Sequence, residues 1–88
     1  MTVRLDRAYR LDDQVAVRPE PFGALCYHFG NRRLTFLKSA EIVAVVEGLA
    51  EHGSVADSLR AAGIEERRWP LFIRGLGSLE ASEIIHEC

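Results

Sequence analysis

Residues 23–39 constrain the fold of this chain more than any other stretch. Large apolar side chains alternate with smaller or polar ones on both sides of Gly30-Asn31, a pair that readily forms a turn. The alternation predicts a β-hairpin in which the large apolar residues share one face. We expect this face to be the buried one, with the residues Leu25, Tyr27, Phe29, Leu34 and Phe36.

The length of the turn decides which residues pair. A two-residue loop pairs Tyr27 with Leu34, and a four-residue loop pairs Tyr27 with Phe36. Both loops keep the large apolar side chains on one face. Both also predict that the backbone amides of Thr35 and Leu37 point away from the neighbouring strand, because hydrogen-bonded pairs recur at every second position.

The rest of the chain predicts one earlier strand region and three helices. A first strand, or two short pieces, is expected between Tyr9 and Val17. Ser39 and Ser54 are good N-caps for helices over residues 40–52 and 55–62, and a third helix begins near Glu66. The order is therefore β-β-β-α-α-α in one α+β domain, residues 1–88, with a flexible start (1–8) and a frayed tail (86–88).

Composition excludes several classes of protein. The chain is 48% hydrophobic and 27% charged, as in ordinary soluble domains, and its net charge of −2 gives no general attraction to nucleic acid or an anionic membrane. Residues 1–10 carry charges and no apolar core, so no signal peptide is expected. These features predict a cytoplasmic protein.

Two cysteines are too few for a disulfide framework, although each lies two residues from a histidine. A four-ligand metal site from these residues is conceivable. We prefer a simpler interpretation, in which a half-buried strand cysteine and a surface histidine are followed by a frayed tail: Cys26, His28, His86 and Cys88.

No sequence signature of an enzyme is present. Ser, His and Asp residues are scattered through turns, caps and the tail, and Gly75-Leu76-Gly77 lies late in a helix, where it cannot form a phosphate loop. We therefore predict a protein without catalytic residues, metal or cofactor.

Several fragments together resemble a known family. Residues 23–30 have the form Gly-x-Leu-x-Tyr-x-Phe-Gly, a Leu-x-Phe-Leu strand follows, and an aromatic third helix comes after two serine-capped ones. This order is similar to the RiPP precursor recognition elements, winged-helix peptide chaperones like the pyrroloquinoline-quinone precursor chaperone. The sequence of residues 18–25 and 27–33 is most similar to the mycofactocin biosynthesis chaperones. Glu83 departs from the pattern, since the family often has glycine there.

The resemblance implies a winged helix-turn-helix-like fold and a non-catalytic role. Such a chaperone captures the leader of a precursor peptide by β-strand addition and presents it to a radical SAM maturase. We expect Leu34 and Phe36 to face the third helix and form apolar pockets, although apolar residues in such positions are more often simply core. The candidate peptide-binding residues are Arg33, Leu34, Thr35, Phe36, Leu37, Lys38, Arg67, Arg68, Leu71, Phe72 and Arg74.

A DNA-binding regulator is the alternative, because winged helices also read the major groove. Arg67 and Arg68 would suit DNA. The third helix, however, begins with Trp69, Pro70 and Leu71, where polar base-reading side chains would be needed.

Overall fold

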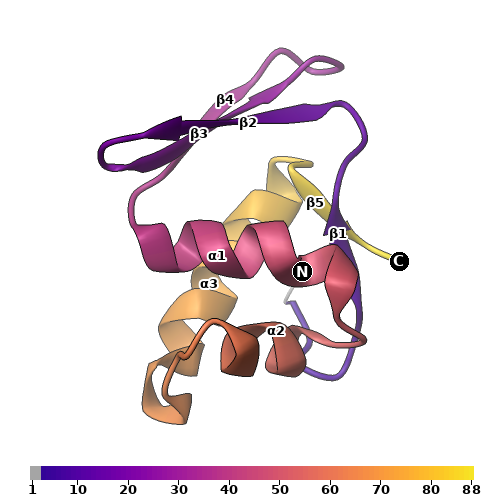
Figure 1. The fold of residues 1–88 in the computed structure, drawn as a ribbon. Helices are drawn as coiled ribbons and strands as arrows, with labels where there is room; N and C mark the ends of the chain where they lie inside the picture. Colours follow the sequence, from indigo (N-terminus) through magenta and orange to yellow (C-terminus); the bar gives the residue numbers. More distant parts are fainter. Residues whose placement is uncertain (1–2) are drawn as a thin grey trace.

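The computed structural model describes residues 3–88, which form an α+β domain with two antiparallel sheets and three α-helices (Figure 1). A three-stranded sheet has the order β2-β3-β4, and a second, two-stranded sheet pairs β1 with β5. The elements are β1 (Tyr9–Leu11), β2 (Val15–Glu20), β3 (Gly23–His28), β4 (Leu34–Leu37), α1 (Ala40–Gly48), η1 (Leu49–Glu51), α2 (Val55–Ala61), η2 (Glu66–Arg68), α3 (Trp69–Ala81) and β5 (Ile85–Glu87).

The predicted helices are present, and their ends follow the expected local chemistry. The Ser39 hydroxyl accepts a hydrogen bond from the Ile42 amide (3.2 Å), and the Ser54 hydroxyl accepts one from the Asp57 amide (3.2 Å). Each bond satisfies an amide that would otherwise lack a partner at a helix start. The region expected to be one strand or two is two, since β1 and β2 belong to different sheets.

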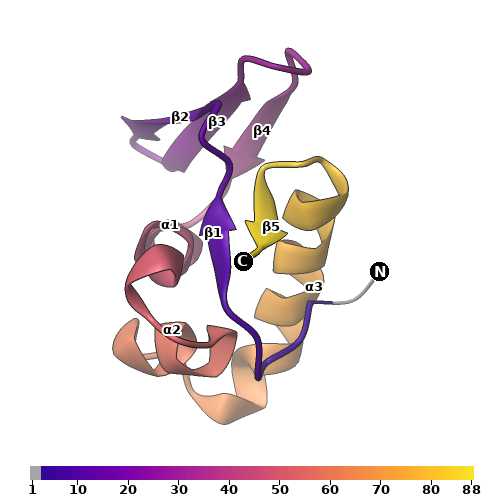
Figure 2. The same cartoon turned by 90° about the vertical axis from the view of Figure 1, so that its right-hand side faces the viewer.

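In the sheet β2-β3-β4, the face that packs against the helices is not the one that we expected. Ala24 and Cys26 are fully buried, whereas Leu34 and Phe36 are 59% and 57% exposed. The small side chains of Ala24 and Cys26 thus form the helix-facing side of β3. Within the sheet, a Cβ on Gly23 would lie 2.1 Å from the Leu37 carbonyl oxygen of β4, so glycine is needed there. The expectation that the large apolar face is buried is therefore wrong. The outer face of the sheet, which points away from the helices, has no helix or strand over it in Figures 1 and 2.

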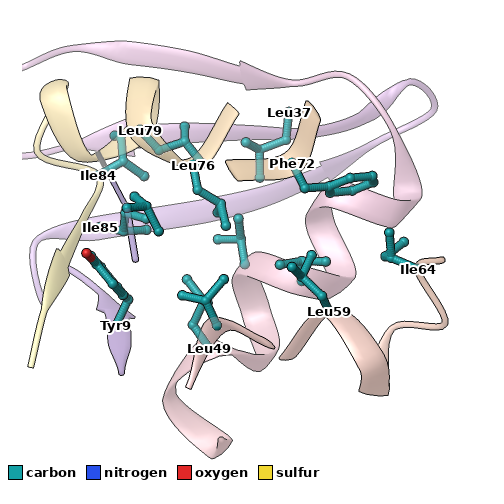
Figure 3. Packing of buried hydrophobic residues seen from close by; sticks show 14 of the residues in the cluster. Tyr9, Leu37, Leu49, Leu59, Ile64, Phe72, Leu76, Leu79, Ile84 and Ile85 are labelled. Carbon is teal, nitrogen blue, oxygen red and sulfur yellow. The ribbon is translucent and has the colours of Figure 1, made fainter. Parts of the chain in front are cut away.

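The hydrophobic core lies below the sheet, between α1, α2, α3 and the two-stranded sheet (Figure 3). The largest fully buried side chains come from elements far apart in the sequence: Tyr9, Leu49, Leu59, Leu76, Ile84 and Ile85. Such a core fixes α3 relative to the sheet, and hence the space between α3 and β4.

Both ends of the described chain are held. Val3 is buried, and the carbonyl of Arg7 accepts a hydrogen bond from the Val55 amide (2.9 Å). At the other end, β5 pairs with β1, and the Cys88 amide donates to the Ala8 carbonyl (3.0 Å). The strand β5 thus includes two of the residues expected to form a frayed tail, 86–88. Of the start expected to be flexible, 1–8, residues 3–8 are described, and residues 1–2 lie outside the described part.

Val46 lies on the buried stripe of α1 and is 1% exposed. We expect Val46→Ala to lower the free energy of unfolding by about 1–3 kcal/mol, because it removes core volume that the neighbours cannot refill. The exposed neighbouring side chain of Glu47 gives the control, since Glu47→Ala should change stability by less than about 0.5 kcal/mol. Urea unfolding of both variants measures the difference. Equal midpoints would contradict the assigned face.

Candidate functional site: the free edge of β4

The hairpin between β3 and β4 closes through the buried His28. Its amide donates to the Arg33 carbonyl (3.0 Å), and its ring Nδ1 accepts hydrogen bonds from the amides of Gly30 (3.0 Å) and Asn31 (3.1 Å). The strand pairing is that of the two-residue loop, with Tyr27 opposite Leu34. The ring nevertheless pulls four residues, 29–32, out of the ladder. His28, expected on the surface, is 5% exposed.

Because of this closure, every backbone amide in β4 points in the direction opposite to the one that we predicted. The hydrogen bond from His28 to Arg33 makes this a hydrogen-bonded pair, so the next such pairs are Cys26 with Thr35 and Ala24 with Leu37. The amides and carbonyls of Leu34 and Phe36 therefore point to the free edge. The expectation that Thr35 and Leu37 point there is wrong, because it assumed that the residues directly flanking Gly30-Asn31 pair.

The neighbouring strand agrees with this assignment. The Phe29 amide donates to the Gln14 carbonyl (2.8 Å), so odd-numbered residues at this end of β3 bond toward β2. The same alternation turns the ring nitrogen of Pro19 in β2 outward, at the other edge of the sheet. Proline at an edge position costs no ladder bond and prevents further pairing there. β4 contains no proline and keeps its outward donors.

A groove of about 450 Å³ adjoins this free edge and separates β4 from the second half of α3. It is lined by Thr35, Phe36, Leu37, Lys38, Ile42, Gly75, Ser78 and Leu79. Small residues on α3 keep it open, and a Cβ placed on Gly75 would meet no atom within 4 Å. Leu71, Gly75 and Ser78 are spaced four and three apart and share one face of the helix.

The predicted site residues divide between the two faces of the sheet. Thr35 and Leu37 project toward the groove, as their pairing with buried residues of β3 requires. Leu34 and Phe36 project to the outer face, so the expectation that their side chains face α3 is wrong. On α3, Phe72 is buried as a core residue, while Leu71 is 66% exposed, as its position off the main apolar stripe predicted.

The predicted arginines at the start of α3 are engaged within the chain. Arg68 donates to both carboxylate oxygens of Glu41 (2.6 and 2.8 Å), and Arg67 lies 3.3 Å from a carboxylate oxygen of Glu65. The hydrogen bond from Arg68 holds the pKa of Glu41 below its usual value, and the same bond raises the pKa of Arg68. Glu41 lies in the first turn of α1, one residue before Ile42, which lines the groove.

Three other predicted cations carry their charge without an internal partner. Within residues 3–88, Arg33, Lys38 and Arg74 form no ion pair. Lys38 lines the groove itself. Arg33 lies at the tip of the hairpin and Arg74 precedes Gly75 on α3, so the surroundings of the groove carry free positive charge although the whole chain is acidic.

Four lining residues were not predicted: Ile42, Gly75, Ser78 and Leu79. Ile42 and Leu79 follow the core pattern of their helices, and nothing in the sequence separates a groove wall from a core residue. Gly75 and Ser78 do carry a signal, because two small residues three apart on an otherwise apolar helix leave one side of that helix bare.

Two histidines approach the same carboxylate, since His28 and His86 lie 3.7 and 3.6 Å from oxygens of Asp12, but the two cysteines do not join them. Cys26 is fully buried, and burial raises the pKa of its thiol, whereas Cys88 is exposed at the other end of the chain. Within the described residues, no three His, Cys, Asp or Glu side chains are placed to hold a metal ion. Nor does any helix in this part of the chain have the length and apolar character that crossing a bilayer requires.

Comparison with known proteins gives a consistent result. The family model described as the peptide chaperone MftB family matches residues 8–86. The chain is 50% identical over 80 residues to the peptide chaperone MftB of Mycobacterium ulcerans, and this match covers 91% of the chain and 73% of the relative. Identity to the proteins of the same name from Mycobacterium tuberculosis and Mycolicibacterium smegmatis is 46% and 48% over the same length, covering 73% and 78% of those relatives.

No solved structure matches the chain, so the expected likeness to winged-helix proteins stays a prediction. The family and its members are named for a chaperone role, which is non-catalytic. With a model match over 79 of its 88 residues and these identities, the chain belongs to the peptide chaperone MftB family.

Proposed function

We propose that this protein is a peptide chaperone of mycofactocin biosynthesis that captures the leader of its precursor peptide as an added strand on β4. The observation that carries the proposal is the free edge of β4 beside an open groove. Unpaired amides and carbonyls at such an edge bind an extended peptide without regard to its sequence, and adjacent pockets supply the specificity.

The guest strand hydrogen-bonds to the backbone of Leu34 and Phe36. Side chains of the guest that lie opposite Thr35 and Leu37 enter the groove, because paired residues of neighbouring strands project from the same face. The walls that they meet are apolar or small: Leu37, Ile42, Leu79, Gly75 and Ser78. A leader with aliphatic or aromatic residues at alternate positions fits this groove.

The charge around the groove favours an acidic leader. Lys38 and Arg74 carry free positive charge near its walls, and Arg68 retains part of its field beside Glu41. Local positive charge speeds the capture of an acidic peptide more than it raises the final affinity. Once loaded, the chaperone presents the peptide to a radical SAM maturase, which supplies the chemistry that this chain lacks.

Calorimetric titration with the synthetic leader peptide tests the proposal, and a short DNA duplex at low salt tests the regulator alternative. Binding of the leader at micromolar or better affinity, with no binding of the duplex, is the expected result. Binding of the duplex alone would overturn the proposal.

Amide hydrogen exchange resolves the mode of binding. In the free protein we expect the amides of Leu34 and Phe36 to exchange fast and those of Thr35 and Leu37 slowly, since only the latter are in the ladder. Saturation with the leader should slow the first pair by about tenfold or more, because each amide gains a hydrogen bond. Residue-resolved NMR measures this change. If the protected amides lie only on α3, the guest does not extend the sheet.

A further inference from the structure

The outer face of the sheet β2-β3-β4 exposes an apolar patch that the peptide site leaves unused. Four of its side chains are at least 45% exposed: Phe22 (45%), Phe36 (57%), Leu34 (59%) and Phe29 (62%). Leu34 and Phe36 project from this face, Phe22 packs against the Phe36 ring, and Phe29 packs against Tyr27, which pairs with Leu34. No helix or strand covers the backbone of the sheet on this side (Figures 1 and 2). Single exposed apolar residues need no explanation, whereas the largest contiguous apolar patch of a protein is often functional.

The patch is ordered by its own contacts. Phe22 and Phe36 meet edge to face with ring centroids 5.8 Å apart, and Tyr27 and Phe29 do so at 5.0 Å. Aromatic pairs of this kind add about 0.5–1.5 kcal/mol beyond the burial of their area, and aromatic residues are enriched at protein interfaces.

Its size distinguishes between two kinds of occupant. Taking roughly 200 Å² for a fully exposed large side chain, the four residues present on the order of 400 Å² of apolar surface. Permanent homodimers bury well over about 1,000 Å² on each side, whereas a reversible complex of standard size buries about 800 Å², of which little more than half is apolar. The patch therefore fits the centre of a reversible complex better than that of a permanent homodimer.

The charged side chains around the patch indicate which charges a partner surface should carry. Arg18 and Glu20 form an ion pair on β2 (2.9 Å), which leaves that side of the patch neutral. At the hairpin tip, Arg32 forms no ion pair within residues 3–88, so this end is positive. A matching partner has an apolar surface with carboxylates at one end.

We infer that the outer sheet face is the docking surface for the enzyme that modifies the peptide. The inference rests on the proposed function, which supplies the reason for such a partner. A guest strand on β4 extends the same sheet, so every second guest side chain joins Leu34 and Phe36 on the outer face. The enzyme then contacts chaperone and peptide on one continuous surface and binds the loaded chaperone more tightly than the empty one.

The double variant Phe22→Ser/Phe29→Ser tests the inference, because neither residue lies on β4 or lines the groove. We expect its affinity for the radical SAM maturase of the same system, measured by calorimetry without and with leader peptide, to fall about tenfold or more. Peptide affinity should stay within about threefold of wild type. Leu5→Ser, at an apolar residue 39% exposed outside the patch, is the matched control and should bind the maturase normally.

Three outcomes would overturn the inference. Maturase binding at wild-type strength by the double variant would show that the enzyme docks elsewhere. Light scattering that finds a wild-type dimer and a monomeric variant would make the face a contact between two copies. A folded double variant that has lost the peptide would make the face part of the peptide site. If the wild type binds no peptide at all, the proposed function fails, while the titrations without peptide still decide where the maturase docks.

Discussion

Phe36→Pro should give a folded domain whose affinity for the leader peptide is about 10- to 100-fold lower than that of the wild type. Phe36 directs its amide to the free edge of β4, so proline removes a donor that only the guest uses. The guest carbonyl then loses its partner, at a cost of about 1–3 kcal/mol. Calorimetry with the leader measures the affinity, and circular dichroism confirms the fold.

Two matched variants separate the backbone from the side chain. Phe36→Val keeps the amide and should bind within about fivefold of wild type. Thr35→Pro removes a ladder bond to β3 and should instead destabilise the domain by about 3 kcal/mol or more. Should Phe36→Pro stay folded and capture the leader at wild-type strength, the guest does not pair with this edge.

Gly75→Leu should abolish most leader binding while leaving the domain at least as stable. A side chain at this position extends into open space within the groove, where no atom lies within 4 Å of the Cβ. The leucine side chain fills the part of the groove that we propose the guest side chains occupy. It is also a better helix former than glycine by somewhat less than about 1 kcal/mol. We expect an affinity loss of about 30-fold by calorimetry, together with an unchanged or higher unfolding midpoint.

Gly75→Ala provides the control. One methyl group takes little of a groove of about 450 Å³, so leader affinity should change by less than about threefold. Stability should rise by up to about 1 kcal/mol, since alanine loses less backbone entropy than glycine when the helix forms. Wild-type binding by Gly75→Leu would show that the groove stays empty when the peptide binds.

The sequence predicted the elements of this fold because the signals that define them are local. Ser39 and Ser54 cap the helices they were expected to cap, and the hairpin pairs Tyr27 with Leu34 as a two-residue loop requires. The pairing of β1 with β5 joins Tyr9 to Glu87, and no local pattern in either short strand indicates so distant a partner.

The faces of the hairpin could not be predicted from hydrophobicity alone. Apolar residues are usually buried, but the rule does not run backwards, since functional surfaces are apolar too. Here Ala24 and Cys26 pack inward because the sheet lies close to α1, and Phe29 is left exposed. The prediction of the amide directions in β4 failed for a different reason. The ring nitrogen of His28 accepts hydrogen bonds from the turn and reshapes it, and a side-chain contact of this kind has no sequence signature.

The pairing of β1 with β5 also has a consequence for the order in which the domain forms. The hairpin and the helices are made of contacts between near neighbours, whereas Tyr9 and Glu87 are separated by nearly the whole chain. Contacts across such a distance close late, because the entropy of a long loop must be overcome first. During synthesis β1 leaves the ribosome early and stays unpaired until its partner strand β5, which ends at Glu87, has also emerged. The hairpin that carries the β4 edge depends only on contacts within residues 15–37, so it can form before β1 and β5 close the core.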